Sequence, residues 1–88
     1  MKKTFKLTII TPENEFFKGD IVNLNCETTE GRMGILPDHC ALIAGLIPTI
    51  TRFEEVSGET HEVSTSEGIL KVRKNNVSIL CSTAQYIK

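Results

Sequence analysis

The chain has 88 residues, of which 40% are hydrophobic and 24% charged, and its formal net charge is −1. This length provides apolar material for one core only, so we expect a single domain over residues 1–88. The basic residues are dispersed among acidic ones, which excludes a phosphate-backbone footprint and predicts no nucleic-acid partner. No apolar run approaches the roughly 18 residues that cross a bilayer, so we predict neither a signal peptide nor direct membrane insertion.

The first third of the chain has the pattern of half-buried strands. Residues 4–11 alternate between apolar and polar until Pro12 ends the run. A short apolar piece follows around Phe16 and is closed by Gly19. In the segment 22–26, apolar residues alternate with asparagines, which predicts that Val22, Leu24 and Cys26 share one face.

Residues 28–34 have the composition of an exposed loop, because two glycines lie in a short polar stretch. Such a loop could carry contacts to a partner. The apolar run 40–47 is ambiguous, since Pro37 could begin a short helix ahead of it. Gly45 and Pro48 restrict the run, and we interpret it as a buried strand.

The remaining chain reads as a succession of hairpins. We predict strands over 49–56, 60–65, 69–73 and 77–81, with turns at Ser57 and Gly58, at Glu67 and Gly68, and at the Asn75-Asn76 pair. No window sustains the 3.6-residue periodicity of a helix. Many short strands at this spacing predict an all-β sandwich or barrel.

No arrangement of reactive side chains points to catalysis or to cofactor binding. Residues 31–34 contain two glycines but lack the lysine and the helix of a phosphate-binding loop. His39 and His61 are 22 positions apart without nearby cysteine pairs, so no zinc ligand set is evident. The adjacent His39 and Cys40 would point to opposite faces of a strand, which is unsuitable for a Cys-His nucleophile. We therefore predict no catalytic, metal or cofactor-binding residue.

The three cysteines form an odd set without a CxxC pair, which argues against a disulfide framework. Their positions are Cys26, Cys40 and Cys81. We predict free, buried thiols in a reducing compartment.

An ordered set of motifs resembles the epsilon-subunit family of the F-type ATP synthases from one end of the chain to the other. The motifs are FKL at 5–7, ITPE at 10–13, FKG at 17–19, EGxxGILPxH at 30–39, LxP at 46–48, GILxV at 68–72 and NVxIL at 76–80. The resemblance implies an N-terminal β-sandwich of about ten strands, in agreement with the hairpin pattern.

The resemblance also implies a function and a set of contacts. It implies a non-catalytic subunit of the central stalk of the proton-translocating ATP synthase, which transmits rotation between the c-ring and the gamma subunit during ATP synthesis. The subunit would act in a complex with alpha, beta and delta subunits, peripheral to the cytoplasmic face of the bacterial plasma membrane. The residues implied to contact the c-ring are Thr29, Glu30, Gly31, Arg32 and Met33. Those implied to contact gamma are Thr11, His39 and Ala44.

Two departures from the family pattern limit these implications. Arg32 stands where many members carry an acidic residue, which reverses a charge at the implied c-ring contact. The C-terminal helical hairpin of full-length relatives has no counterpart before Lys88, so we expect no C-terminal helical domain here and assign no inhibitory or ATP-binding role. The alternative hypothesis is a free-standing β-sandwich that binds a small ligand or peptide, which would require an exposed aromatic platform.

Overall fold

The computed structural model describes residues 3–87, which form nine β-strands and no helix. The strands are β1 (Phe5–Ile10), β2 (Glu15–Thr28), β3 (Gly31–Ile35), β4 (Leu42–Leu46), β5 (Thr49–Glu55), β6 (Thr60–Thr65), β7 (Gly68–Arg73), β8 (Asn76–Cys81) and β9 (Ala84–Tyr86). Within residues 3–87 there is consequently no helix long and apolar enough to cross a membrane.

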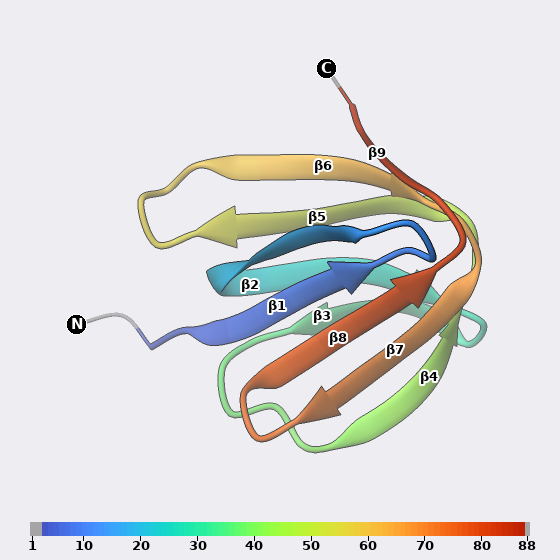
Figure 1. Cartoon of the computed structure of the whole chain (residues 1–88). Coiled ribbons are helices and arrows are strands. Elements are labelled where there is room, and N and C mark those ends of the chain that lie inside the picture. Colours follow the sequence, from blue (N-terminus) through green and yellow to red (C-terminus); the bar gives the residue numbers. More distant parts are fainter. Residues whose placement is uncertain (1–2, 88) are drawn as a thin grey trace.

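The strands form two layers that β2 connects (Figure 1). The first half of β2 pairs with β1, and the order continues through β8 and β7 to β4; we call this layer the β8 sheet. The second half of β2 pairs with β3 on one side and β5 on the other, followed by β6 and β9; we call this layer the β5 sheet. All neighbours are antiparallel except β1 and β8, which are parallel.

A sharp bend in β2 carries the chain from one sheet to the other. The pairing register with β5 shifts between Ile21 and Asn23, as expected for a β-bulge. Ile21 pairs with Phe5 of the β8 sheet and also with Glu55 of the β5 sheet. The bulge changes the predicted alternation: Leu24 and Cys26 are buried as expected, but Ile21 is fully buried and Val22 only partly.

The core lies between the two sheets and draws on nearly every strand. Its largest fully buried side chains include Phe53 from β5, Leu7 from β1 and Leu70 from β7. The buried hydroxyls of Thr51 and Thr65 lie 3.1 Å apart and hydrogen-bond one another. Among the described residues no buried side-chain nitrogen or oxygen lacks a hydrogen-bond partner, as expected for a well-packed core.

The prediction of an all-β sandwich is confirmed, with several local corrections. The expected loop over 28–34 is wrong, because residues 31–35 form β3 and only two residues turn the chain. The expected turn at Asn75 and Asn76 lies one residue earlier, where Lys74 and Asn75 both have positive φ. The strand β9 was not predicted, and nine strands are formed rather than about ten.

Two predictions of burial also need correction. The apolar run 40–47 does contain a strand, β4, but it is not buried throughout, because the side chain of Ile43 is 73% exposed. All three cysteines are free thiols; Cys26 and Cys81 are buried as predicted, whereas Cys40 lies in the exposed connection between β3 and β4.

Candidate interaction surfaces

The outer face of the β8 sheet carries a row of exposed aliphatic side chains. Ile10 of β1 pairs with Leu80 of β8, which pairs in turn with Ile69 of β7. Residues opposite one another in a ladder project from the same face, so the three side chains form one continuous row. They are 36%, 39% and 47% exposed, respectively. Ile43 of β4 lies diagonally beside Ile69, whose direct partner on β4 is Gly45, and we call these four residues the aliphatic patch.

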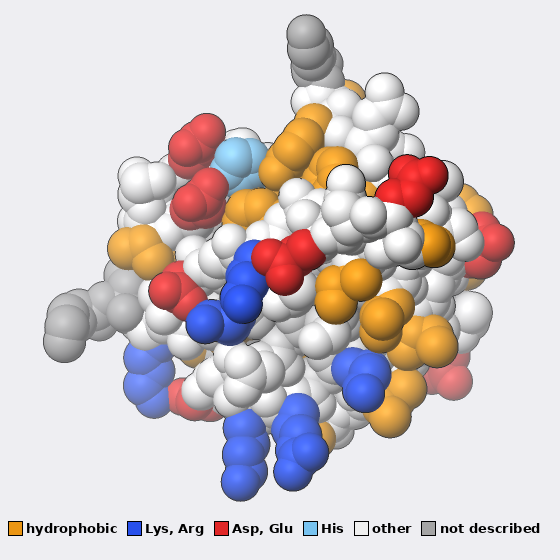
Figure 2. Space-filling view, in the orientation of Figure 1, with side chains coloured by type: hydrophobic (Ala, Val, Ile, Leu, Met, Phe, Trp, Pro, Cys, Tyr) orange, Lys and Arg blue, Asp and Glu red, His pale blue; other side chains and the backbone are white. Residues whose placement is uncertain are grey.

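The aliphatic patch is visible as a cluster of hydrophobic side chains over the region of β8, β7 and β4, with a basic side chain among them (Figure 2). The strand register places Lys71 of β7 directly opposite Ile43 on this face. A hollow of about 610 Å³ lies beside this pair and extends to Arg73. None of its lining residues is aromatic. The surface is therefore apolar and basic, without the aromatic platform that a ligand-binding module would need.

The outer face of the β5 sheet is more polar, and several of its charged side chains are paired with neighbours. Arg52 Nε donates to Glu62 Oε2 at 2.6 Å across β5 and β6. The amide of Asn23 donates to Glu54 Oε1 at 2.9 Å. Surface pairs of this kind contribute little to stability but keep a face well solvated. The outer face of the β8 sheet, which carries the aliphatic patch, is therefore the better candidate for a protein–protein interface.

A two-residue turn joins β2 to β3 and forms a tip at one end of the sandwich. The hydroxyl of Thr28 donates to the carbonyl of Gly31 at 2.9 Å and accepts the N–H of Glu30 at 3.1 Å. Gly31 has φ of +124°, a conformation that a side chain would strain. Of the residues implied to contact the c-ring, Thr29, Glu30, Gly31 and Arg32 are exposed at or beside this tip. Met33 instead packs against the core.

The residues implied to contact gamma occupy three separate places. Thr11 follows the end of β1, in the turn that leads to β2. His39 lies in the β3–β4 connection, which Asp38 ties to Lys3 ahead of β1. The length of β1, about 20 Å by strand geometry, therefore separates Thr11 from His39. Ala44 pairs with the buried Leu70 and is itself half-buried. The exposed side chain at this place on β4 is that of Ile43, not of Ala44.

The β3–β4 connection is held by a small polar network around Asp38, which has a positive φ of 67°. Lys3 Nζ donates to Asp38 Oδ2 at 2.6 Å, and Asn75 Nδ2 donates to Asp38 Oδ1 at 2.9 Å. These hydrogen bonds, with the charge of Lys3, lower the pKa of Asp38 below its ordinary value. The network joins the chain start, this connection and the β7–β8 turn.

The pairing of His39 with Cys40 has no geometry for nucleophilic catalysis. The expectation that the two lie in a strand is wrong, because they belong to the connection before β4. His39 Nδ1 lies 2.8 Å from the backbone carbonyl of Cys40, so the ring contacts the main chain rather than the thiol. The imidazole is therefore not hydrogen-bonded to the thiol and is not placed to accept its proton.

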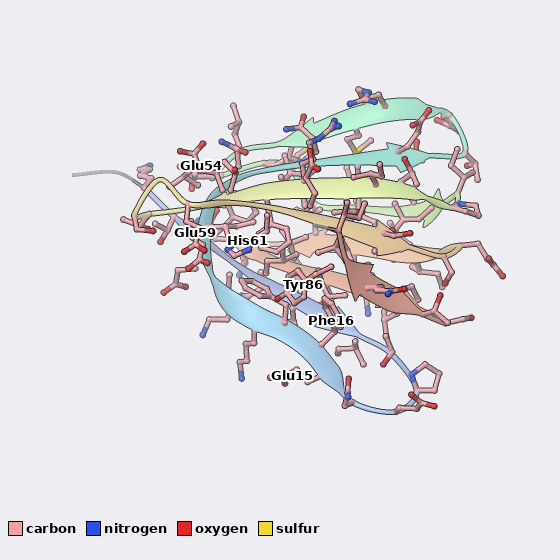
Figure 3. All side chains as sticks on the ribbon, turned by 90° about the horizontal axis from the view of Figure 1, so that it is seen from above. Glu15, Phe16, Glu54, Glu59, His61 and Tyr86 are labelled. Atoms are coloured by element: carbon pink, nitrogen blue, oxygen red, sulfur yellow. The ribbon has the colours of Figure 1, made fainter. Side chains whose placement is uncertain are left out.

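A second cluster of polar and aromatic groups lies around the β5–β6 turn. His61 Nε2 hydrogen-bonds the carboxylate of Glu55, and Glu59 Oε2 lies 3.9 Å away. The ring of His61 stacks on Phe53, with centroids 5.1 Å apart. Figure 3 shows His61, Tyr86 and Phe16 following one another beside the first half of β2, so these rings occupy the side of the sandwich between β2 and β6.

This cluster is the one place in residues 3–87 where three metal-ligating side chains converge, with ligand atoms within 4.8 Å of one another. Zinc sites use such nitrogen and carboxylate ligands, normally four with tetrahedral geometry. The cluster of Glu55, Glu59 and His61 was not predicted, because only the spacing of His39 and His61 was considered as a sign of a metal site. A signal was present, because Glu55, Glu59 and His61 flank a single predicted turn. Glu59 is exposed, whereas Glu55 is half-buried and already hydrogen-bonded to His61, so the cluster primarily holds the β5–β6 hairpin together.

Comparisons with known proteins agree with this architecture. Residues 4–87 match the family described as the ATP synthase delta/epsilon chain, β-sandwich domain. The ATP synthase epsilon chains of Clostridium novyi and Clostridium kluyveri are 48% and 40% identical over 86 residues, which is 98% of this chain. The chain spans 66% and 65% of the length of these two relatives.

Two solved structures share the fold. A chain in the cryo-EM structure of the Euglena gracilis mitochondrial ATP synthase, described as OSCP/F1/c-ring in rotational state 1, has a TM-score of 0.90 at 25% identity. The alignment covers 94% of this chain and 53% of that chain. A chain in the central stalk/c-ring structure of the Tetrahymena thermophila mitochondrial ATP synthase has a TM-score of 0.78 at 20% identity and covers 94% of this chain and 66% of that chain. At that identity the second likeness concerns the fold alone.

Proposed function

Because the chain belongs to the family of ATP synthase delta and epsilon chain β-sandwich domains, we propose that it acts as the β-sandwich of a non-catalytic central-stalk subunit, of the epsilon type. In this role it couples rotation of the c-ring to the gamma subunit and the catalytic head. The domain supplies stiffness and contact surfaces rather than chemistry. The complex it joins holds alpha, beta and delta subunits and lies at the cytoplasmic face of the bacterial plasma membrane.

The observation that carries this proposal is the contrast between the two outer faces of the sandwich. The β5 sheet presents paired polar groups, whereas the β8 sheet presents the aliphatic patch. Apolar side chains in a continuous row gain most when a partner covers them, since each buried CH₂ contributes about 0.8 kcal/mol. The gamma subunit covers this face in the proposed assembly, with Ile43 and Ile69 near the centre of the contact.

The tip at the β2–β3 turn makes the second contact, with the c-ring. The turn is tight and braced by two hydrogen bonds of Thr28, so it can transmit force without large deformation. The exposed Glu30 and Arg32 set the register of this contact more than its affinity, because exposed ion pairs contribute about 0.2–1 kcal/mol each. Arg32 requires a negative charge on the c-ring, whereas an acidic residue at this position would require a positive one.

The decisive experiment is binding of the chain to the gamma subunit of its own organism. The double variant Ile43→Ser and Ile69→Ser removes two exposed apolar side chains of the patch while leaving the core intact. We expect the Kd to rise at least about tenfold, since apolar anchors dominate such contacts. The matched control is Ile50→Ser, which removes an isoleucine side chain about as exposed as Ile69 (42% against 47%) from the outer face of the β5 sheet.

The control variant should bind gamma as the unmodified chain does. Equal binding by all three proteins, or recovery of the chain from its native cells without gamma, alpha or beta, would contradict the proposal. The latter result would favour the free-standing ligand-binding module instead.

A further inference from the structure

We infer that the partner on the outer face of the β8 sheet meets Lys71 with a carboxylate of its own. This inference rests on the proposed docking of that face and adds the chemistry of the partner's surface. The observation behind it is the position of Lys71 beside the exposed Ile43 and Ile69. It concerns a residue that neither the sequence motifs nor the implied contact residues single out.

Lys71 lies at the edge of the aliphatic patch, with apolar neighbours on two sides and polar neighbours on the other two. Cross-strand pairing places Ile43 of β4 on one side of it and Ser78 of β8 on the other. Two residues away on β7, Ile69 and Arg73 project from the same face, since side chains of a strand alternate. Neighbouring strands are about 4.8 Å apart, so a partner that covers Ile43 and Ile69 also covers the stem of Lys71.

The face itself offers Lys71 no negative charge. The strands β1, β4, β7 and β8 contain no aspartate or glutamate. Within residues 3–87, no acidic group lies within ion-pair distance of Lys71 or of Arg73. The first half of β2 carries Glu15 and Asp20, which lie opposite Ile10 and Lys6 of β1 and are separated from β7 by β1 and β8. Lys71 and Arg73 therefore have no acidic partner within the described chain.

Covering an ammonium group without a counter-charge is costly, because it loses hydration and gains nothing in return. Two solutions are open to a partner. The flexible lysine stem can extend so that the ammonium group stays in water at the rim. Alternatively, the partner supplies a carboxylate, which turns the charge into a determinant of specificity. Lys71 lies in the middle of β7 beside Ile43 and Ile69 and has no acidic partner of its own, which favours the second solution.

The substitution Lys71→Met distinguishes these two solutions by the sign of its effect. Methionine keeps an unbranched apolar stem and removes the charge. If the partner supplies a carboxylate, the variant leaves that group covered and unpaired, and the Kd for gamma rises by roughly tenfold or more. If the ammonium group stays in water, Lys71→Met leaves the Kd unchanged or lowers it.

The measurement is the Kd of the full chain for immobilised gamma subunit of the same organism, at a fixed salt concentration near 0.15 M. Lys71→Arg retains the charge and should lose less affinity than Lys71→Met. Arg52→Met, on the outer face of the β5 sheet, serves as the matched control and should bind normally. Urea unfolding of each variant verifies that the exposed substitutions leave the fold intact.

Failure of the inference and failure of the docking proposal give different results. Weakened binding by the double serine variant at Ile43 and Ile69, together with normal or tighter binding by Lys71→Met, would overturn the carboxylate while keeping the docking face. Normal binding by the double serine variant would overturn both. Weakened binding by the double serine variant and by Lys71→Met, with normal binding by the control, is the expected result.

Discussion

The substitution Gly68→Ala tests the tightest backbone approach in the sandwich. Gly68 begins β7 and pairs with Cys81 of β8. A Cβ built on Gly68 would lie 2.9 Å from the carbonyl carbon of Leu80 and 3.0 Å from the Cα of Cys81, and closer still to the Leu80 carbonyl oxygen. All three atoms are backbone, so no side-chain rotation can relieve the clash, and the two strands must separate locally.

The expected cost combines two terms. Inserting a group into a well-packed region costs about 1–3 kcal/mol, and opening the β7–β8 ladder beside Gly68 loses one or two hydrogen bonds of about 1 kcal/mol each. We therefore expect Gly68→Ala to lower the free energy of unfolding by about 2–5 kcal/mol. For a domain of this size, 1 kcal/mol corresponds to about 4–8 °C in Tm, so Tm should fall by at least about 8 °C.

Urea and thermal unfolding, followed by far-UV circular dichroism, measure this loss. Gly45→Ala is the matched control, because it also lies in a strand and its Cβ would meet only the side chain of Thr29, at 3.3 Å. That side chain can move, so the control should cost less than about 1 kcal/mol. Similar stabilities for Gly68→Ala and Gly45→Ala would refute the steric argument and the β7–β8 register on which it rests.

Two further predictions concern titratable groups. Burial raises the pKa of the Cys26 thiol to about 11, so Cys40 should be alkylated by iodoacetamide at pH 8 while Cys26 reacts only after unfolding, as mass spectrometry of the native chain would reveal; equal labelling of both would contradict the structure. The lowered pKa of Asp38 means that its contribution to anchoring the β3–β4 connection is present above the ordinary aspartate range of about pH 4 and is lost as pH falls through the lowered value. An NMR titration should give a midpoint for Asp38 below that of an unstructured aspartate, and Lys3→Gln should move it upward; an unchanged midpoint in Lys3→Gln would show that the pair does not form in solution.

The local pattern of the sequence was sufficient for most strands because a strand alternates with a period of two wherever one face is buried. The alternation in residues 4–11 predicted β1, and the hairpin signals after Thr49 predicted β5 to β8 nearly to the residue. The same reasoning failed at 28–34, where two glycines suggested a loop. There the pairing of Gly31 to Ile35 with β2 decided the structure, and such pairing depends on residues outside the segment.

The contact residues were less accessible than the fold. The motif order indicated a family and a tip, and the tip residues Thr29 to Arg32 do lie exposed at one end of the sandwich. The aliphatic patch was not anticipated, because its members lie in four strands that are distant in the sequence. Each of them occupies an ordinary alternating position, so nothing in its own strand marks it as part of a surface.

By itself, the sequence determined that the chain is an all-β domain without the spacing of a catalytic or nucleotide-binding motif, and that its motifs belong to one family. These are properties of composition, periodicity and order along the chain. Only the tertiary structure decided that β2 serves both sheets, and that Ile10, Leu80 and Ile69 form one row with Lys71 beside Ile43. The physical reason is that side-chain direction is set locally within a strand, whereas the neighbours of each side chain are set by register between strands.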